Sequence, residues 1–276
     1  MTPSRLPSKL RPDEGETAMH EGFEIVHGKG PLVATALHAG HALRDEVAER
    51  LQVDEVTRRR EEDPYTDLWT VLAPTRVIAT RSRFEVDLNR PREQAVYRGP
   101  CDAWGIEIWR EPPGDGLLAR SLRQHDAFYA EVGALLDGMV ARHGRVALVD
   151  LHAYCHRRGG PDAEPDDPGQ NPEINLGTRW LDRDACRPLI DRFADDLRAF
   201  DFDGRHLDVR ENVKFQGGHF IRWVTRRYQG QVCTLPVEVK KFFVDEWTDT
   251  LDTELHRRIG AALQSAVPGL LEELAR

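Results

Sequence analysis

Cysteine is scarce in this sequence, and no two cysteines are close together. The chain has 276 residues, and its cysteines are Cys101, Cys155, Cys186 and Cys233, without a CxxC pair. Thiolate zinc sites and the disulfide frameworks of small secreted domains usually show closely spaced cysteines. The sequence therefore indicates neither kind of site, and we expect reduced and mostly buried thiols.

Long hydrophobic runs are also missing. A helix that crosses a bilayer needs roughly 20 consecutive apolar residues, and no stretch comes near that length. The first residues lack the apolar segment of a signal peptide. Hydrophobic residues make up 40% and charged residues 31% of the chain, a balance typical of a globular protein and not of a disordered one. We expect a cytoplasmic protein with no membrane partner.

Positive charge is not concentrated anywhere in the chain. The formal net charge is -9, and lysines and arginines alternate with acidic residues. Proteins that bind nucleic acid usually present a basic stripe or patch. The sequence therefore argues against a nucleic-acid partner, and an anionic small molecule would need a local cluster of arginines.

The length and patterning favour one large α/β domain. Residues 1–21 are polar, contain three prolines and are predicted to form a flexible N-terminal arm, with a single catalytic domain over residues 22–276. In residues 121–142 apolar side chains recur at helical spacing, and an apolar run follows at 145–152, an order typical of a helix that leads into a buried parallel strand. Further strands are predicted at 23–26, 32–37, 76–80, 206–209 and 232–238, and helices at 43–51, 55–62, 189–200 and 250–274.

Histidines stand where two of these strands end. His38 follows the strand at 32–37, and the strand at 145–152 ends with Asp150 and His152. In open α/β sheets the ligand crevice lies at the carboxyl ends of the strands, so these side chains are candidates for chemistry. Taken singly, each could equally serve as a cap or turn residue.

Two further segments carry candidate functional groups. Arg83, Asn89 and Arg90 lie in a loop with few apolar residues, and arginine binds carboxylates through two parallel hydrogen bonds. The alternative is a solvated loop held by salt bridges. Glu238 ends an apolar strand, where burial should raise its pKa and suit it to act as a general base. It could also be the buried ion-pair partner of an arginine.

Together these residues are typical of metal-assisted hydrolysis. A catalytic zinc takes three protein ligands and leaves one position for water, and His38, a carboxylate and His152 would supply that set. Glu238 would take the proton of the attacking water. Arg83 would stabilise the oxyanion that forms at the carbonyl. Asn89 and Arg90 would hold a substrate carboxylate.

The motifs that contain these residues resemble those of the N-formylglutamate amidohydrolases, a family distantly similar to aspartoacylases and zinc carboxypeptidases. The resemblance extends from about residue 23 to residue 246 and rests on six motifs in the same order. They are Leu37-His38-Ala39-Gly40, Asp63-Pro64-Tyr65-Thr66-Asp67, Ser82-Arg83-Phe84 to Asp87-Leu88-Asn89-Arg90-Pro91, Val149-Asp150-Leu151-His152, Gly217-Gly218-His219-Phe220, and Glu238 to Asp245-Glu246.

The resemblance implies a phosphorylase/hydrolase-like fold, a three-layer α/β/α arrangement with a mostly parallel mixed sheet. It implies zinc or another divalent metal as cofactor, and hydrolysis of a small N-acyl acidic amino acid, most directly N-formyl-L-glutamate. The site residues that we predict are Glu238 and Arg83 for catalysis, Asn89, Arg90 and His219 for substrate binding, and His38, Asp63 and His152 for the metal.

Departures from the family pattern leave alternatives open. Carboxypeptidases place two metal ligands as His-x-x-Glu, but His41 is the third residue after His38, so we choose Asp63 as the second ligand over Glu46, Asp67 and His41. Leu37 replaces the usual proline, and Ala153 stands where serine is common. A carboxypeptidase-like hydrolase of a small peptide or of another N-acyl amino acid is therefore an alternative. A non-catalytic metal- or ligand-binding descendant is another, although mere binding would need no base such as Glu238.

The long segment at 157–178 is the last sequence feature with a functional interpretation. It is crowded with proline, aspartate, asparagine and glycine, and irregular loops of this length are uncommon inside compact domains unless they are functional or disordered. Because it leaves directly from the predicted site, we interpret it as a lid that shapes the substrate pocket.

Overall fold

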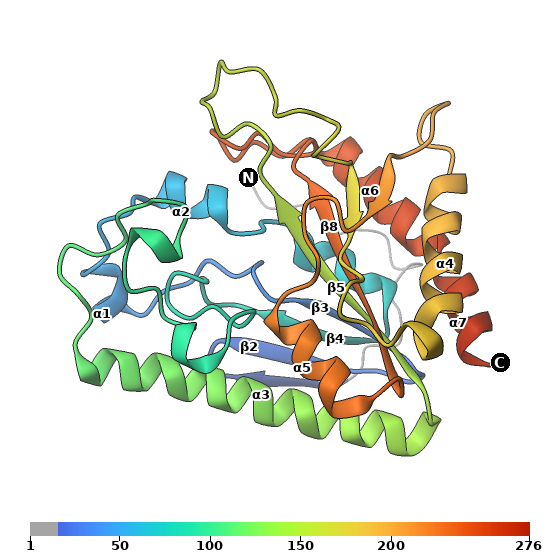
Figure 1. Cartoon of the computed structure of the whole chain (residues 1–276). Coiled ribbons are helices and arrows are strands. Elements are labelled where there is room, and N and C mark those ends of the chain that lie inside the picture. Colours follow the sequence, from blue (N-terminus) through green and yellow to red (C-terminus); the bar gives the residue numbers. More distant parts are fainter. Residues whose placement is uncertain (1–15) are drawn as a thin grey trace.

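A mixed sheet of eight strands forms the centre of the structure (Figure 1). The computed structural model describes residues 16–276. The strands are β1 (Glu16–His20), β2 (Phe23–His27), β3 (Leu32–Ala36), β4 (Thr75–Ala79), β5 (Val146–Tyr154), β6 (Ile174–Leu176), β7 (Val209–Glu211) and β8 (Val232–Lys240). Their order across the sheet is β1-β2-β4-β3-β5-β8-β6-β7, and the four neighbours β4, β3, β5 and β8 run parallel.

The central strands are apolar along their length because both of their faces are covered. Every residue of β3 and β5 is buried, and so is most of β8. Parallel strands that lie between two helical layers typically show such continuous apolar runs. The carboxyl ends of these three strands meet at one edge of the sheet, which positions the residues that follow them close together.

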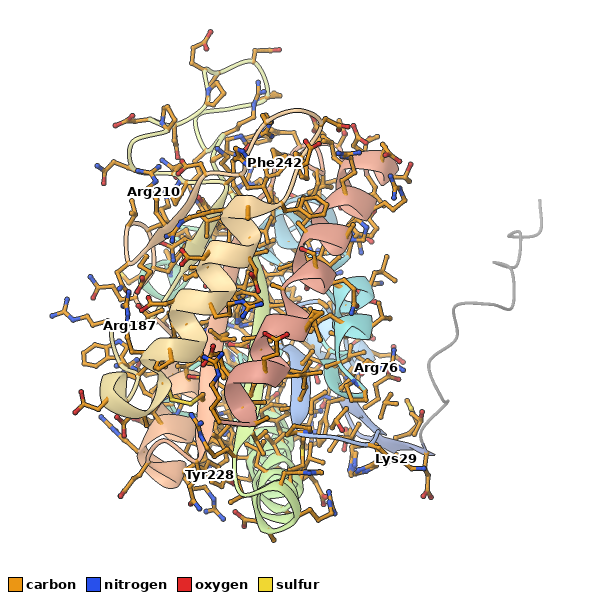
Figure 2. All side chains as sticks on the ribbon, turned by 90° about the vertical axis from the view of Figure 1, so that its right-hand side faces the viewer. Lys29, Arg76, Arg187, Arg210, Tyr228 and Phe242 are labelled. Carbon is orange, nitrogen blue, oxygen red and sulfur yellow. A yellow bond between two sulfur atoms is a disulfide. The ribbon has the colours of Figure 1, made fainter. Side chains whose placement is uncertain are left out.

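Helices cover both faces of the sheet. On one face α3 packs against α5, with the rings of Phe128 and Phe220 5.8 Å apart and those of Tyr129 and Trp223 4.9 Å apart. On the other face α4 lies beside α6 and α7 (Figure 2). The helices are α1 (Asp45–Ala48), α2 (Glu55–Glu61), α3 (Asp115–His143), α4 (Arg183–Ala199), α5 (His219–Tyr228), α6 (Thr253–Ser265) and α7 (Val267–Leu274), with short 3-10 helices η1 (Thr66–Leu72), η2 (Arg92–Gln94) and η3 (Pro100–Asp102).

This architecture confirms the predicted single α/β domain with a mostly parallel mixed sheet. The predicted strands at 23–26, 32–37, 76–80, 145–152 and 232–238 are β2, β3, β4, β5 and β8. The predicted helix at 121–142 is α3, which begins six residues earlier. Among residues 16–276, no helix has the length and apolar character needed to cross a membrane.

Two local predictions were wrong, and helix α5 was not predicted. The predicted arm at 1–21 includes β1, which pairs with β2 across a tight turn at Gly22, where the backbone has a φ of 90°. This edge strand is mostly exposed, so it lacks the apolar alternation that identifies a strand, and residues 1–15 lie outside the described part. The predicted loop at 157–178 contains the buried strand β6. Helix α5 begins directly after the glycines at 217–218.

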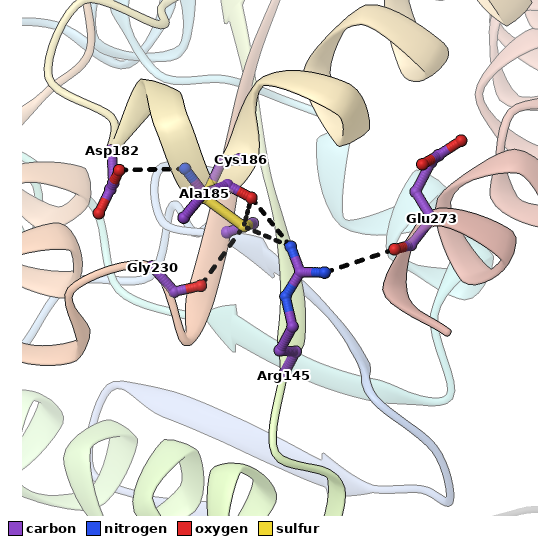
Figure 3. Close-up of a disulfide and its surroundings, with 7 residues drawn as sticks. Arg145, Asp182, Ala185, Cys186, Gly230 and Glu273 are labelled. Atoms are coloured by element: carbon purple, nitrogen blue, oxygen red, sulfur yellow. Dashed lines mark hydrogen bonds between the residues drawn. A yellow bond between two sulfur atoms is a disulfide. The ribbon is translucent and has the colours of Figure 1, made fainter. Parts of the chain in front are cut away.

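The expectation of four reduced cysteines was also wrong. Cys186 on α4 and Cys233 on β8 form a disulfide, whereas Cys101 and Cys155 are free. Next to it, Arg145 donates hydrogen bonds to the carbonyls of Ala185 at 2.9 Å and Glu273 at 3.5 Å (Figure 3). Disulfides are rare in the cytosol of most organisms, so the pair also weakens the basis for the predicted cytoplasmic location.

The disulfide should stabilise the fold mainly by restricting the unfolded chain. Its cysteines are 47 residues apart, a separation for which the chain-entropy model gives about 4 kcal/mol of stabilisation. We expect Cys186→Ser to lower the free energy of unfolding by about that amount in urea denaturation, and thiol titration of the unfolded wild type to find two reactive cysteines before reduction and four after it.

Cys101→Ser is the matched control, because Cys101 is free and exposed, and its unfolding should match that of the wild type. Four reactive thiols before reduction would contradict the disulfide. Equal unfolding free energies for Cys186→Ser and the wild type would contradict its contribution to stability.

Candidate functional site

A cavity of about 200 Å³ opens at the carboxyl ends of the central strands. His38 comes two residues after β3, His152 lies near the end of β5, and Glu238 lies near the end of β8. The edge of the sheet that was predicted to carry the ligand crevice therefore does contain a cavity, and the predicted strand-end side chains line it.

The two histidines and Asp63 converge in this cavity. Oδ2 of Asp63 lies 2.9 Å from Nδ1 of His152 and 3.3 Å from Nδ1 of His38. All three side chains are buried. The backbone N–H of Asp63 donates to the carbonyl of His38 at 2.9 Å, which fixes the carboxylate next to the first histidine. Asp63 does not cap the following helix, since the N-cap of η1 is Tyr65.

The second nitrogen of each histidine faces another carboxylate. Nε2 of His38 lies 2.8 Å from Asp87, and Nε2 of His152 lies 3.0 Å from Asp150. Asp150 is held in turn by the hydroxyl of Thr35, which donates to it at 2.5 Å. Carboxylates that orient ligand histidines in this way are typical of metal sites, because they fix the ring and raise its basicity.

The pKa values in this group reflect a surplus of negative charge. Burial alone would raise the pKa of Asp63, but its contacts with His152 and His38 hold that pKa well below its usual range. Burial would lower the pKa of His152, yet the charges of Asp150 and Glu238 and the hydrogen bonds to Asp150 and Asp63 raise it well above the ordinary value. A buried site that favours the protonated imidazole also favours a bound cation.

The donor set fits a divalent metal ion. One ligand atom from each of His38, Asp63 and His152 lies within 4.8 Å of the other two. Two imidazole nitrogens and one carboxylate oxygen form a combination found in catalytic zinc sites, which keep a position for water. The group could therefore hold a metal, and the surrounding carboxylates would compensate its charge.

The other side chains that we considered as the second ligand lie elsewhere. Glu46 forms ion pairs with Arg44 and Arg120, and His41 is exposed. Neither of them lines the cavity, and Asp67 does not line it either. Asp63 is the carboxylate that contacts both histidines.

Glu238 lies directly beside the histidine group. It is the partner of His152 in the parallel register of β5 and β8. Burial raises its pKa to about 7, although His152 opposes this shift. Within the described residues Glu238 forms no ion pair, so the structure does not support the alternative in which it pairs with an arginine.

Arg83 reaches the cavity from the loop after β4 and is held by three contacts. Its guanidinium donates to Asp87 at 2.9 Å, to the hydroxyl of Tyr97 at 2.9 Å, and to the carbonyl of Glu61 at 3.2 Å. Burial alone would lower the pKa of Arg83, but the charge of Asp87 raises it well above the ordinary value. Arg83 is therefore a permanent and well-positioned cation.

Asn89 lines the cavity and also connects the loop at 81–91 to α5. Its side-chain oxygen accepts the backbone N–H of Phe220 at 3.0 Å, and its carbonyl accepts that of His219 at 3.2 Å. The close contact between Asn89 and the start of α5 requires a glycine at position 218, because a Cβ there would lie 2.2 Å from the amide oxygen of Asn89.

Arg90 and His219 do not line the cavity. Arg90 stacks on the ring of Tyr97 at 4.5 Å and donates to the carbonyl of Asp102 at 2.6 Å. His219 is the first residue of α5 and lies 5.9 Å from the ring of Tyr129. Their assignment to substrate binding stays a prediction.

Several residues of the cavity wall were not predicted from the sequence. The most polar of them are Arg60, Glu61, Arg158 and Lys241, and Trp104 lies beside them. A signal was present for two of these cations, since Arg158 follows β5 and Lys241 follows β8 within a few residues. The partners that hold them come from distant segments, which the sequence does not reveal.

Comparison with known proteins places the chain in a family. The family model of N-formylglutamate amidohydrolase matches residues 30–242. The structure of N-formylglutamate amidohydrolase from Ralstonia eutropha is similar with a TM-score of 0.73 and 20% identity, covering 92% of this chain and 98% of that one. A gene product from Agrobacterium tumefaciens is similar with a TM-score of 0.63 and 16% identity, covering 92% and 96%.

At these identities the two structures establish the fold, and no curated protein matches the sequence. The family model, in contrast, matches well over half of the chain, which is enough to assign the family. The chain belongs to the N-formylglutamate amidohydrolase family.

Proposed function

We propose that this protein hydrolyses the amide bond of an N-acyl acidic amino acid, with N-formyl-L-glutamate as the first candidate substrate. The observation that carries the proposal is the buried group of His38, Asp63 and His152, which shares one cavity with Glu238 and Arg83. Family membership supports the same reaction. The cavity of about 200 Å³ is smaller than the roughly 300–1,000 Å³ of ordinary ligand pockets, which favours a small amino acid derivative over a peptide.

His38, Asp63 and His152 would hold the metal, and zinc suits their donor atoms best. When bound, zinc would polarise the amide carbonyl and make the attacking water more acidic. Asp87 and Asp150 keep the Nε2 atoms of the two histidines occupied, so the Nδ1 atoms, which lie next to Asp63, would be the ones to hold the metal.

Glu238 acts as the general base in this proposal. Its carboxylate takes a proton from the attacking water and then delivers it to the nitrogen of the departing amino acid, which balances the proton transfers of hydrolysis. Its position beside His152 and its freedom from ion pairs with the described residues support this role. A pKa of about 7 allows both steps near neutral pH.

Arg83 and Asn89 orient the substrate. The fixed guanidinium of Arg83 stabilises the negative charge that develops on the carbonyl oxygen, and the amide of Asn89 binds a carboxylate of the substrate. Cys155 also lines the cavity, but burial raises the pKa of its thiol to about 11. The protonated thiol is a poor nucleophile, which favours water over cysteine as the attacking group.

The direct test is formate release from N-formyl-L-glutamate by zinc-loaded protein, with N-acetyl-L-glutamate and N-formyl-L-aspartate run in parallel. We expect turnover of the formyl substrate, loss of turnover on chelation, and recovery when zinc is restored. Zinc should also raise the melting temperature of the apoprotein, because it binds only the folded site. His38→Ala should abolish that increase.

An apoprotein that binds no zinc would contradict the metal site. If zinc binds but none of the three substrates is turned over, the metal site stands and the proposed reaction is wrong.

Replacement of the base tests the catalytic assignment. We expect Glu238→Gln to lower kcat by roughly 10²- to 10⁴-fold, the range typical of a general base, while zinc content stays at the wild-type level. Glu131→Gln, at an exposed position on α3, is the control and should retain wild-type kcat. Unchanged turnover of Glu238→Gln would eliminate Glu238 as the base.

The pH dependence of kcat/KM offers a second test of Glu238. A general base works in its ionised form, so the rate should rise with pH and level off above the pKa of Glu238. Burial raises that pKa to about 7 without a metal, and a neighbouring cation would lower it, so the midpoint of the rise should lie at pH 7 or below. Glu238→Gln should lose this limb in its residual activity, and a limb that persists there would belong to another group.

A further inference from the structure

Three cations in the cavity wall have no part in the reaction described so far. Arg60, Arg158 and Lys241 line the cavity together with the buried residue Glu61. Nη1 and Nη2 of Arg158 donate to the two carboxylate oxygens of Glu61 at 3.0 and 2.8 Å. Nε of Arg60 donates to one of the same oxygens at 3.2 Å. We refer to Arg60, Arg158 and Lys241 as the outer cations.

The outer cations exceed the negative charge that faces them. The ammonium of Lys241 donates to the carbonyls of Arg60 and Glu62 at 2.5 and 2.6 Å, and it forms no ion pair with a described residue. Glu246 is occupied elsewhere, since it pairs with His156 at 2.8 Å and accepts two backbone N–H groups. Among the described residues, Glu61 is thus the one carboxylate that forms ion pairs with the outer cations, and it pairs with two of the three. This part of the cavity therefore has a surplus of positive charge that suits an anion.

Arg158 is the outer cation best placed to contact a ligand. The guanidinium of Arg60 covers the ring of Trp247 at 4.3 Å, and Lys241 is buried, whereas the side chain of Arg158 is 37% exposed. A guanidinium carries five N–H donors. Glu61 engages one on each terminal nitrogen of Arg158, which leaves donors for a second carboxylate.

Trp104 connects Arg158 with the reaction centre. Its ring lies 5.0 Å from the guanidinium carbon of Arg83 and 5.5 Å from that of Arg158. A substrate whose amide lies at Arg83 and His152 can therefore extend along this ring toward Arg158. The loop that carries Arg158 is already fixed before substrate binds, because Glu246 accepts the backbone N–H groups of the two residues before Arg158.

We propose that Arg158 binds the side-chain carboxylate of the substrate and thereby selects N-acyl dicarboxylic amino acids over those with a single carboxylate. The inference rests on the proposed amide hydrolysis in the same cavity. Lys241 adds positive potential, but it donates to the carbonyls of Arg60 and Glu62 and to the sulfur of Cys155. Arg60 is held against Glu61 and the ring of Trp247. Asn89 and Arg83, at the inner end, remain for the α-carboxylate and the amide.

The test compares two substrates of the same shape that differ in charge, N-formyl-L-glutamate and N-formyl-L-glutamine. We expect Arg158→Gln to lower kcat/KM for N-formyl-L-glutamate by about 10- to 30-fold, the lower part of the range for a hydrogen bond to a charged group. The value for N-formyl-L-glutamine should change by less than about threefold, within ordinary surface effects. Arg158→Lys keeps the charge without the planar fork and should retain part of the preference.

Arg157→Gln is the matched control. It makes the same charge change in the neighbouring residue, whose guanidinium donates to the carbonyls of Pro161 and Ala163 and does not line the cavity. The control should keep the wild-type ratio of the two substrates. An equal loss on both substrates in Arg158→Gln would mean a structural role for Arg158 and would overturn the inference, while the proposed hydrolysis would stand.

A binding measurement separates the inference from the proposed reaction. Calorimetry with glutarate, a dicarboxylate without an amide, needs no turnover. We expect glutarate to bind the zinc-loaded wild type and to bind Arg158→Gln at least tenfold more weakly. Equal binding to both proteins, or no binding to the wild type, would overturn the role of Arg158. Absence of hydrolysis with normal glutarate binding would overturn the proposed function alone.

Discussion

Negative charge gathered at the carboxyl edge of the sheet is the constraint on which the rest of the site depends. Asp63, Asp87 and Asp150 are buried there around two imidazole rings, with Glu238 beside them. Burying a charge is costly unless it is paired or hydrogen-bonded. Asp87 accepts from Asn89, Arg83, Tyr97 and a histidine. The loop at 81–91 is therefore arranged around the needs of one carboxylate, and a metal ion would compensate the negative charge of the others.

The end of α2 links the reaction centre to the outer cations. Helices leave their last carbonyls without internal partners, and cations bind well at this end. The carbonyls of Arg60 and Glu62 accept from Lys241, and that of Glu61 accepts from Arg83. The next residue, Asp63, supplies the carboxylate between the histidines. Four consecutive residues thus set the relative positions of the histidine group, Arg83 and Lys241.

The sequence predicted those features that depend on local pattern. Apolar runs identified the central strands, and their ends identified His38, His152 and Glu238. Contacts between distant segments are not visible in any local pattern of the sequence. Glu61 and Arg158 are 97 residues apart, and the two bonded cysteines are 47 apart, so neither pair can be found from spacing. Asp63 is intermediate, since Asp-Pro is also a good helix start, and the structure shows that its side chain faces the histidines instead.

Glu62 and Glu238 show why a shifted pKa does not by itself identify a catalytic group. Burial raises the pKa of each carboxyl to about 7. Glu62, however, accepts hydrogen bonds from Ser82 and from Arg58, the latter at 2.5 Å, and it does not line the cavity. The carboxylate of Glu62 therefore connects α2 with the loop at 81–91. Glu238 forms no ion pair with the described residues and lines the cavity together with the two histidines. The two glutamates have the same chemistry and a similar pKa. Glu238 differs in lining the cavity and in having no ion-pair partner among the described residues, and these two differences make it the candidate for the base.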